Sequence, residues 1–448
     1  MSVIYGTSGN NNLTGTSSAD TIYGYAGNDT ITGGAGNDSM IGGTGNDIYY
    51  VDSNSDVIVE NANEGTDTVY VTTRTANSIF LSANVENCTL LSGMGKSVEG
   101  NSSTNTIEGN DISNILTGGN YGNDTIYGYG GNDAIYGSID SCYLYGGAGD
   151  DTISARLYST ATGNDIIDGG TGTDRLMGGK GNDTYYVDVQ ADSVEEDANE
   201  GTDSVKSTAT TYYLADNVEN LTMTGATAVN GYGNSLDNYI VGSAANNFIV
   251  GNGGNDTVFG TSGSNTIICA DGNDIIYGGT ETQLQTGNND ISSWGGNDTI
   301  YGAAGADTIN AGAGDDIILG GAGNDLYEFA AGDGADAIAD AAGSDVISFD
   351  STVNRSNIAI YMDSSNNLIL DYGSTAGIDQ IGVADQSTNT IESITTSDGY
   401  FISNTAINQL IQDMTAYATN NSIQLTNVSD VKSNADLMTL VAGAFQVA

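Results

Sequence analysis

The 448-residue sequence contains no proline and no histidine, and its 8 lysines and arginines stand against 57 aspartates and glutamates. The absence of histidine excludes Ser-His and Cys-His nucleophile pairs, HExxH metalloprotease sites and His-ligated zinc. The formal charge of −49 excludes a nucleic-acid binder that works by neutralising phosphates, and it argues against adhesion to an anionic membrane surface. Chemistry that uses carboxylates alone, such as glycoside hydrolysis, survives these exclusions.

Cysteines and long apolar runs are also scarce. Cys88, Cys142 and Cys269 lie too far apart for a disulfide framework, and they form no CxxC pair. No apolar run is long enough to cross a bilayer, so we expect no membrane span. The first residues, MSVIYGTSGNNN, have neither the basic nor the apolar region of a signal peptide, so we expect no cleavable leader.

Glycine and aspartate recur with a nonapeptide period. Residues 24–50 read GYAGNDTIT, GGAGNDSMI and GGTGNDIYY, and the register returns in two later blocks. Two insertions, RLYSTAT at 156–162 and TETQLQT at 280–286, interrupt the register and are interpreted as loops. Cys142 takes one aspartate position, and asparagine takes others. The aspartates in register are Asp20, Asp29, Asp38, Asp47, Asp124, Asp133, Asp151, Asp165, Asp174, Asp183, Asp256, Asp274, Asp298, Asp307, Asp316 and Asp325.

Each nonapeptide divides into a turn and a strand. Glycines in GGxGND allow positive φ, so that several carbonyls and the aspartate carboxylate can face one point. The residues that follow form a short strand with one apolar side chain inward, as at Ile22, Ile31 and Met40. Two nonapeptides make one coil, so stacked coils form two parallel sheets, and Asp29 stacks on Asp47. The fold class predicted is all-β, a parallel β-roll or β-solenoid.

Stacked carboxylates require a cation. Neighbouring rungs lie about 4.8 Å apart, and like charges at that spacing repel. A shell made only of carboxylate and carbonyl oxygens suits Ca²⁺ better than Mg²⁺, which retains its waters. We therefore expect folding and the binding of several calcium ions to be one event.

The pattern resembles the RTX (repeats-in-toxin, haemolysin-type) calcium-binding family. This resemblance implies calcium ligation by the sixteen aspartates and by turn glycines such as Gly36, Gly45, Gly314 and Gly323. It also implies secretion, and the C-terminal residues, ending in AGAFQVA, resemble an uncleaved signal for one-step (type I) export. The export apparatus is therefore an expected partner. Cytosolic calcium is scarce, so the chain would stay unfolded until it reached millimolar calcium outside the cell.

Segments between the blocks repeat one another. Residues 45–73 match residues 181–209, and their alternating Val, Ile and Tyr predict longer strands that continue the solenoid. An alternative left open is that Asp52, Glu60, Glu64, Asp67 and Glu86 line a functional groove. After Asp325 come longer strands and then two helices, the first with Ile407, Leu410, Ile411, Met414 and Tyr417 at helical spacing. The predicted segments are 1–50, first block; 51–100, spacer; 101–187, second block; 188–228, spacer; 229–330, third block; 331–403, β-rich segment; and 404–448, helical cap and export signal.

The repeats, spacers and terminal region account for nearly all of the sequence, so we expect no catalytic residue and no enzyme. We expect a secreted structural protein that assembles head to tail with copies of itself into a surface layer, sheath or filament. An adhesin or biofilm-matrix protein that binds a cell surface or glycan through exposed aromatics, such as Tyr23, Tyr25, Tyr127, Tyr129, Tyr136 and Tyr301, is the alternative. A carboxylate-based enzyme is the third possibility.

Overall fold

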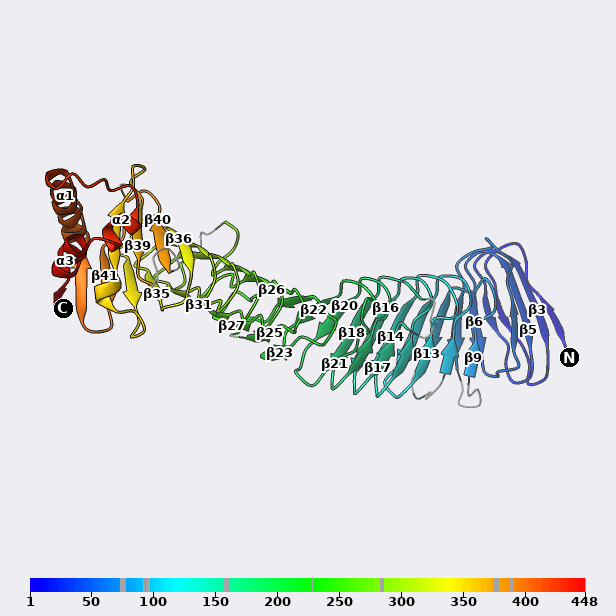
Figure 1. Cartoon of the computed structure of the whole chain (residues 1–448). Coiled ribbons are helices and arrows are strands. Elements are labelled where there is room, and N and C mark those ends of the chain that lie inside the picture. The colour runs from blue at the N-terminus through cyan, green and yellow to red at the C-terminus, as the bar shows by residue number, and fades with distance from the viewer. Residues whose placement is uncertain are drawn as a thin grey trace. The chain divides into compact units, whose positions relative to one another are not determined.

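The computed structural model describes residues 1–448 apart from 73–77, 92, 94–96, 157–160, 228, 283–285, 374–378, 387–389 and 448. The chain divides into two compact units, the first made of Met1–Ala209 and Ala215–Val218, the second of Thr210–Leu214 and Glu219–Ala448. Each unit is built from short parallel strands stacked coil upon coil, and the helices belong to the second unit (Figure 1). The predicted all-β parallel solenoid is confirmed.

The inward apolar residue of each repeat forms the core. Ile22, Ile31 and Met40 are completely buried, whereas the residues on either side of them are half-buried. The parallel register places Ile22 beside Met40 and Ile31 beside Tyr49, each one coil further along the chain. Some strands are longer than expected, because pairing resumes after the glycine. In β3, for example, Tyr25 pairs with Gly43.

Unit 1 contains three groups of paired strands. The first group is β1 (Val3–Tyr5), β3 (Thr21–Ala26), β5 (Ser39–Thr44) and β7 (Val57–Val59). The second is β9 (Ser78–Phe80), β11 (Ser97–Glu99), β13 (Ile115–Thr117), β15 (Ala134–Tyr136), β17 (Thr152–Ser154), β19 (Arg175–Met177) and β21 (Ser193–Val194). The third is β2 (Asn12–Thr14), β4 (Thr30–Thr32), β6 (Ile48–Val51), β8 (Thr68–Val71), β10 (Asn87–Leu90), β12 (Thr106–Asn110), β14 (Thr125–Gly130), β16 (Tyr143–Ala148), β18 (Ile166–Thr171), β20 (Thr184–Val187) and β22 (Ser204–Ser207).

Unit 2 contains two groups, which are parallel until near the C-terminus. One group is β24 (Asn220–Met223), β26 (Tyr239–Val241), β28 (Thr257–Phe259), β30 (Ile275–Tyr277), β32 (Thr299–Ala304), β34 (Ile317–Ala322), β36 (Ala335–Ala339), β40 (Gln380–Val383), β39 (Leu368–Asp371) and β38 (Ala359–Met362). The other is β23 (Thr211–Tyr213), β25 (Asn230–Tyr232), β27 (Phe248–Val250), β29 (Thr266–Ile268), β31 (Asp290–Ser292), β33 (Thr308–Asn310), β35 (Leu326–Phe329), β37 (Val346–Phe349), β41 (Ser393–Thr396), β42 (Tyr400–Ser403) and β43 (Gln446–Val447). Pairing becomes antiparallel among β38, β39 and β40 and among β41, β42 and β43.

The stack absorbs coils of unequal length. Ile48 pairs with Thr68, and Thr68 pairs with Asn87, so the first spacer continues the stack with coils slightly longer than two nonapeptides. The two insertions lengthen single coils, because Tyr143 pairs with Ile166 and Thr266 with Asp290. The centres of the predicted insertion loops, 157–160 and 283–285, lie outside the described residues.

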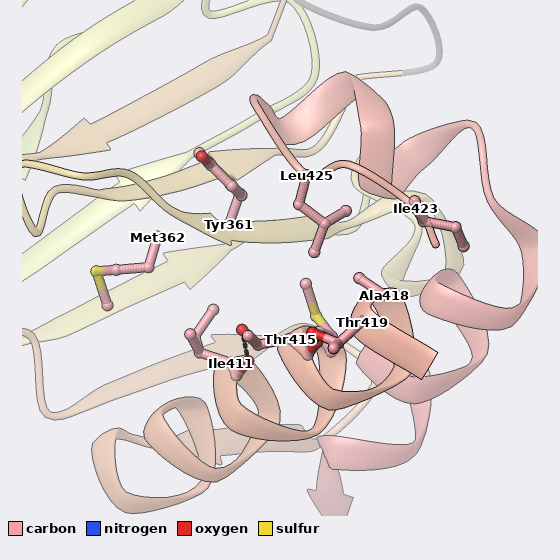
Figure 2. Close-up of a pocket in the computed structure, with 9 residues that line it drawn as sticks. Tyr361, Met362, Ile411, Thr415, Ala418, Thr419, Ile423 and Leu425 are labelled. Carbon is pink, nitrogen blue, oxygen red and sulfur yellow. Dashed lines mark hydrogen bonds between the residues drawn. The ribbon is translucent and has the colours of Figure 1, made fainter. Parts of the chain in front are cut away.

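The C-terminal helices are α1 (Asn404–Asn420), α2 (Val428–Lys432) and α3 (Ala435–Ala444), and a 3₁₀ turn, η1 (Arg355–Asn357), precedes them. Two helices were predicted; the additional helix, α2, is a single short turn that begins at a capping box on Asn427, too short for a periodic apolar signal. A pocket lies between α1 and β38, with Met362, Ile411 and Leu425 in its lining (Figure 2). Within the described residues, no helix combines the length and the apolar character needed to cross a membrane.

Candidate metal centres

The turn aspartates stack on one another in continuous columns, which we call files. In a file, the backbone N–H of each residue donates to the side chain of the corresponding residue one coil further along. The backbone N–H of Asp29 donates to Oδ1 of Asp47 at 2.7 Å, and that of Asp20 donates to Oδ1 of Asp38 at 2.8 Å. The first is the stacking that the repeat predicts, and the second spans one coil in the same way. Every aspartate Oδ1 in such a file is therefore already used as a hydrogen-bond acceptor by the neighbouring coil.

All sixteen predicted aspartates belong to these files, and all are buried. In unit 1 the files run Asn11–Asp29–Asp47–Asp67–Glu86, Asn105–Asp124, Cys142–Asp165–Asp183–Asp203, Ser2–Asp20–Asp38–Asp56 and Asn114–Asp133–Asp151–Asp174–Asp192. In unit 2 they run Asn238–Asp256–Asp274–Asp298–Asp316–Asp336 and Asn247–Asn265–Asn289–Asp307–Asp325–Asp345–Glu392.

Sequence reasoning missed the file members that follow longer coils. Asp67, Asp203 and Asp345 each follow a repeat aspartate by slightly more than two nonapeptides and accept its backbone N–H. The signal was present, because all three end a Gly-x-Asp triplet. Asp67 and Glu86, considered as groove residues, instead extend a file of the solenoid.

The second carboxylate oxygen is different. Among the described residues, the Oδ2 atoms of fifteen file aspartates are buried and receive no hydrogen bond: those of Asp29, Asp38, Asp47, Asp124, Asp133, Asp151, Asp174, Asp183, Asp256, Asp274, Asp298, Asp307, Asp316, Asp325 and Asp336. Burial raises the pKa of Asp47 to about 6, that of Asp133 to about 7 and that of Asp183 to about 8. A buried charged oxygen without a partner is costly, so these positions call for a counter-charge.

A glycine carbonyl lies beside several of the unpartnered oxygens, such as those of Asp29, Asp133 and Asp307. A Cβ built on Gly24 would stand 2.3 Å from Oδ2 of Asp29 and 2.7 Å from the carbonyl oxygen of Gly42. Gly24 therefore has to be glycine, and two acceptors flank it. Two acceptors do not bind each other, so a cation or a hydrogen-bond donor must join them.

Asparagines in the same position show what a donor does there. In unit 2, Nδ2 of Asn247, Asn265 and Asn289 donates to the carbonyls of Gly260, Gly278 and Gly302 at 3.2, 3.1 and 3.0 Å, respectively. The asparagine amide thus forms a hydrogen bond to the glycine carbonyl, whereas an aspartate at this position leaves its Oδ2 and that carbonyl without a link. The aspartate positions present a pair of oxygens that fits Ca²⁺, which takes carboxylate and carbonyl ligands.

The predicted turn glycines support the stack through close backbone contact. Gly36 and Gly45 have φ of 141° and 135°, and a Cβ on Gly45 would stand 2.2 Å from the carbonyl oxygen of Gly27. Gly314 and Gly323 are placed in the same way in unit 2. The carbonyls nearest the aspartate oxygens belong to the first glycine of the turn, as at Gly42. Calcium ligation by Gly36, Gly45, Gly314 and Gly323 stays a prediction.

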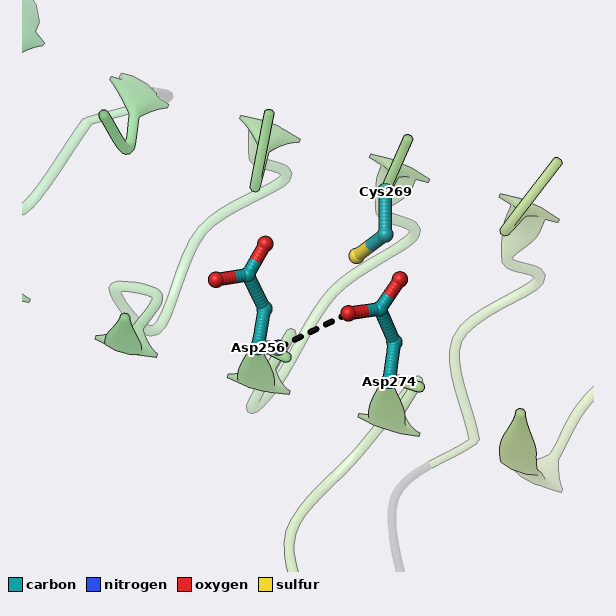
Figure 3. A group of neighbouring side chains, drawn as sticks. All are labelled: Asp256, Cys269 and Asp274. Carbon is teal, nitrogen blue, oxygen red and sulfur yellow. Dashed lines mark hydrogen bonds between the residues drawn. The ribbon is translucent and has the colours of Figure 1, made fainter. Parts of the chain in front are cut away.

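Asp20 and the turn that contains Cys269 depart from the pattern. Oδ2 of Asp20 accepts the hydroxyl of Thr16 at 2.6 Å, and the hydrogen bonds from Thr16 lower the pKa of this aspartate to about 2. Cys269 stands at a first-glycine position, and its thiol points toward the carboxylates of Asp256 and Asp274 (Figure 3). Burial raises the pKa of this thiol well above its usual value, so it is a neutral neighbour rather than a thiolate.

Stacked carboxylates that face backbone carbonyls across a parallel solenoid define a protein of the calcium-binding β-roll class. The family model for the RTX calcium-binding nonapeptide repeat, which spans four copies of the repeat, matches about half of the chain, and the chain belongs to this family. The matched residues are 5–40, 27–58, 109–141, 143–156, 159–194, 232–267, 251–281 and 286–327. A comparison with curated proteins found no match. The predicted cofactor, calcium, is confirmed, and proteins with these repeats are generally secreted.

Proposed function

We propose that this calcium-binding repeat protein is a secreted structural protein, without catalytic activity, that folds on calcium outside the cell. It then assembles head to tail with copies of itself into a surface layer, sheath or filament. The observation that carries this proposal is the difference between the first coil of unit 1 and the last strands of unit 2.

In the first coil of unit 1, the strands pair on one side only within the described residues. Within the described residues, β1 pairs only with β3, and β2 pairs only with β4. Val3 and Tyr5 on β1 are exposed. A strand edge of this kind offers unpaired backbone groups to another chain, and no lysine or proline blocks it.

The last strands of unit 2 are covered. The pairing there turns antiparallel, and α1 contacts β42, while α2 contacts β38 and β39. Two unlike surfaces favour heterologous contacts, which give open filaments or lattices rather than closed dimers. At a charge of −49, the subunits repel one another until calcium neutralises them.

Calcium also supports the proposed route of export. Without the ion, buried carboxylates at successive rungs make the folded state costly, so the chain stays unfolded where calcium is scarce. An unfolded chain can be threaded through a type I export apparatus, and millimolar calcium outside the cell then supplies the free energy of folding.

An adhesin is the second candidate, because tyrosines form stacked clusters on the surface. Tyr5, Tyr23 and Tyr25 stack with ring centroids 5.5 to 6.3 Å apart, and Tyr127 stacks on Tyr129. Tyr25 and Tyr129 are 53% and 50% exposed and have φ of 80° and 71°, a region that favours glycine. Aromatic rings held there at a conformational cost would suit stacking on sugars of a glycan.

Light scattering and electron microscopy across a calcium titration test the assembly. We expect particles that grow above a threshold of calcium, and the double variant Val3→Lys/Tyr5→Lys should abolish growth without changing circular dichroism. The matched control is Ile115→Lys/Ile317→Lys, at exposed positions on β13 and β34, which are paired on both sides. Monodisperse monomers at millimolar calcium and high protein concentration would contradict assembly. If the protein is retained on glycan-coated beads and Tyr25→Ala abolishes this retention, the adhesin is supported instead.

A further inference from the structure

The repeat at the end of each of the three blocks carries a tyrosine at the inward position. Shortly after Asp47, Asp183 and Asp325, the side chains of Tyr49, Tyr185 and Tyr327 are completely buried, where most other repeats have isoleucine. A buried phenol needs a hydrogen-bond partner. In all three cases that partner is a carboxylate, and the phenol hydroxyls donate to Glu60, Glu196 and Asp340, respectively.

The partner carboxylate stands where an ordinary coil has a glycine. Gly24 and Gly42 are the first glycines of two stacked turns, and the same step along the chain from Gly42 reaches Glu60. A Cβ built on Gly42 would stand 2.1 Å from Oδ2 of Asp47 and 2.5 Å from Oε1 of Glu60. In an ordinary coil, the aspartate faces a neutral glycine carbonyl, whereas here it faces a second carboxylate.

A third carboxylate completes each group. Ligand oxygens of Asp47, Glu60 and Asp67 lie within 4.8 Å of one another. Asp47 and Glu60 are only 1% and 6% exposed, yet Oδ2 of Asp47 and Oε2 of Glu60 receive no hydrogen bond within the described residues. Two unpartnered, buried oxygens thus belong to a group of three acidic side chains whose ligand atoms lie close together.

The same arrangement occurs in unit 2. Ligand oxygens of Asp325, Asp340 and Asp345 lie within 4.8 Å of one another. Oδ2 of Asp325 and Oδ1 of Asp340 are buried and receive no hydrogen bond from the described residues, although both residues are at most 3% exposed. A tyrosine hydroxyl again holds one oxygen of the middle carboxylate.

The second group of unit 1 is partly neutralised. Asp183, Glu196 and Asp203 cluster in the same way, but Nη2 of Arg156 stands 4.0 Å from Oε2 of Glu196. The backbone N–H of Gly179 also donates to Glu196, at 3.1 Å to Oε1. This group therefore serves as an internal comparison with lower net charge.

We propose that Asp47–Glu60–Asp67 and Asp325–Asp340–Asp345 form calcium sites in which a third carboxylate takes the place of the glycine carbonyl of an ordinary nonapeptide site, and that these sites fill first as free calcium rises. Affinity in all-oxygen calcium sites increases with the number of charged ligands and with rigidity. Each of these sites has three carboxylates where two stacked turns of an ordinary coil have two. The buried tyrosine acts as a positioning residue, because its hydroxyl holds the middle carboxylate, Glu60 or Asp340, in place. The Asp183–Glu196–Asp203 group binds less tightly because Arg156 already supplies positive charge. The proposal rests on calcium binding by the family and not on assembly.

Equilibrium dialysis of the full chain against buffered calcium tests the proposal. The wild type should bind two ions at least tenfold more tightly than the remainder. Glu60→Gln should remove one of them and Asp340→Asn the other, while Arg156→Gln should bring a third ion into the tight class. The matched control is Glu99→Gln, an exposed glutamate on β11, which should change neither the number nor the affinity of the tight ions.

Tyr49→Phe separates positioning from ligation. It removes the hydroxyl but no carboxylate, so one tight ion should weaken without being lost. Circular dichroism at saturating calcium checks that each variant folds, and Asp340→Asn provides an independent test if Glu60→Gln does not. If Glu60 is instead a protonated carboxyl bound to Tyr49, the tight ions will be unchanged in Glu60→Gln and Asp340→Asn, and the proposal is wrong. Light scattering of the same variants at saturating calcium reports on assembly separately.

Discussion

The change of one aspartate to asparagine should stabilise the protein without calcium and destabilise it with calcium. Asp307 is the best position, because it directly follows three asparagines in its file. Oδ1 of Asp307 accepts two hydrogen bonds from Asn289, one from the backbone N–H at 2.6 Å and one from the side-chain amide at 3.0 Å. Oδ2 of Asp307 is one of the unpartnered oxygens. Asp307→Asn keeps the first oxygen and replaces the second with an amide donor.

The two conditions give effects of opposite sign. Without calcium, the new amide can donate to the Gly320 carbonyl, as Asn289 does to Gly302, and a net hydrogen bond contributes about 1 kcal/mol. The variant also removes a buried charge, which adds to this gain. With calcium at a hundredfold excess over its dissociation constant, the variant forgoes a bound ion worth about 2.7 kcal/mol. The net loss in calcium is therefore on the order of 1–2 kcal/mol.

Circular dichroism against free calcium, with thermal melting at millimolar calcium, measures both effects. Asp307→Asn should fold at lower calcium with a shallower transition, and it should melt at lower temperature in saturating calcium. Asn289→Asp is the reciprocal variant and should shift each quantity the other way. If both variants move the calcium midpoint and the melting temperature in a single common direction, the amide and the cation do not occupy equivalent places, and the reasoning fails.

The remaining predictions concern the whole stack. Chelation should convert the chain from β-rich to largely unfolded, which circular dichroism would show; an unchanged spectrum contradicts coupled folding. In chelator, protonation of the buried aspartates should substitute for calcium. Burial raises the pKa of Asp133 to about 7 and that of Asp183 to about 8 in the folded state, against about 3.9 in the unfolded chain. The folded state therefore binds more protons, so β structure should increase as pH falls from 8 to 5 and be lost as pH rises. With calcium bound, acid should instead release the ions. Gly45→Ala should cost at least about 2 kcal/mol in thermal unfolding, because φ is 135° and the Cβ meets the Gly27 carbonyl, whereas Gly253→Ala, where a Cβ meets nothing, is the control.

The periodic part of this structure follows from the sequence. A nonapeptide period with one apolar and one acidic position determines which side chains point inward and which meet at the turns. The burial of Ile22 and Met40 and the stacking of Asp29 on Asp47 therefore needed no tertiary information. The same periodicity cannot reveal features that occur once per block.

Glu60 illustrates what was missed. In the sequence it is one acid among several in a spacer, and such acids are usually solvated. The first glycines of the turns, Gly24 and Gly42, are one coil apart, and the same step from Gly42 reaches Glu60. The same step from the inward Ile31 reaches Tyr49. Only the folded coil shows that the tyrosine hydroxyl and the carboxylate meet, since Tyr49 and Glu60 lie apart in the sequence, one on β6 and the other just after β7.

The asparagine file of unit 2 changes how its calcium dependence should be understood. Asn247, Asn265 and Asn289 join their coils by amide hydrogen bonds on one edge, so this edge needs no cation. On the other edge of the same coils, Asp256 and Asp274 leave Oδ2 unpartnered within the described residues. In these coils, the asparagine hydrogen bonds already hold one edge to the next coil before any ion binds. Binding of calcium at the other edge therefore costs less chain entropy than it does in coils that have aspartate at both turns. Calcium should therefore order these coils at lower concentration than the coils around Asp29 and Asp38, and residue-resolved hydrogen exchange during a calcium titration would reveal that order.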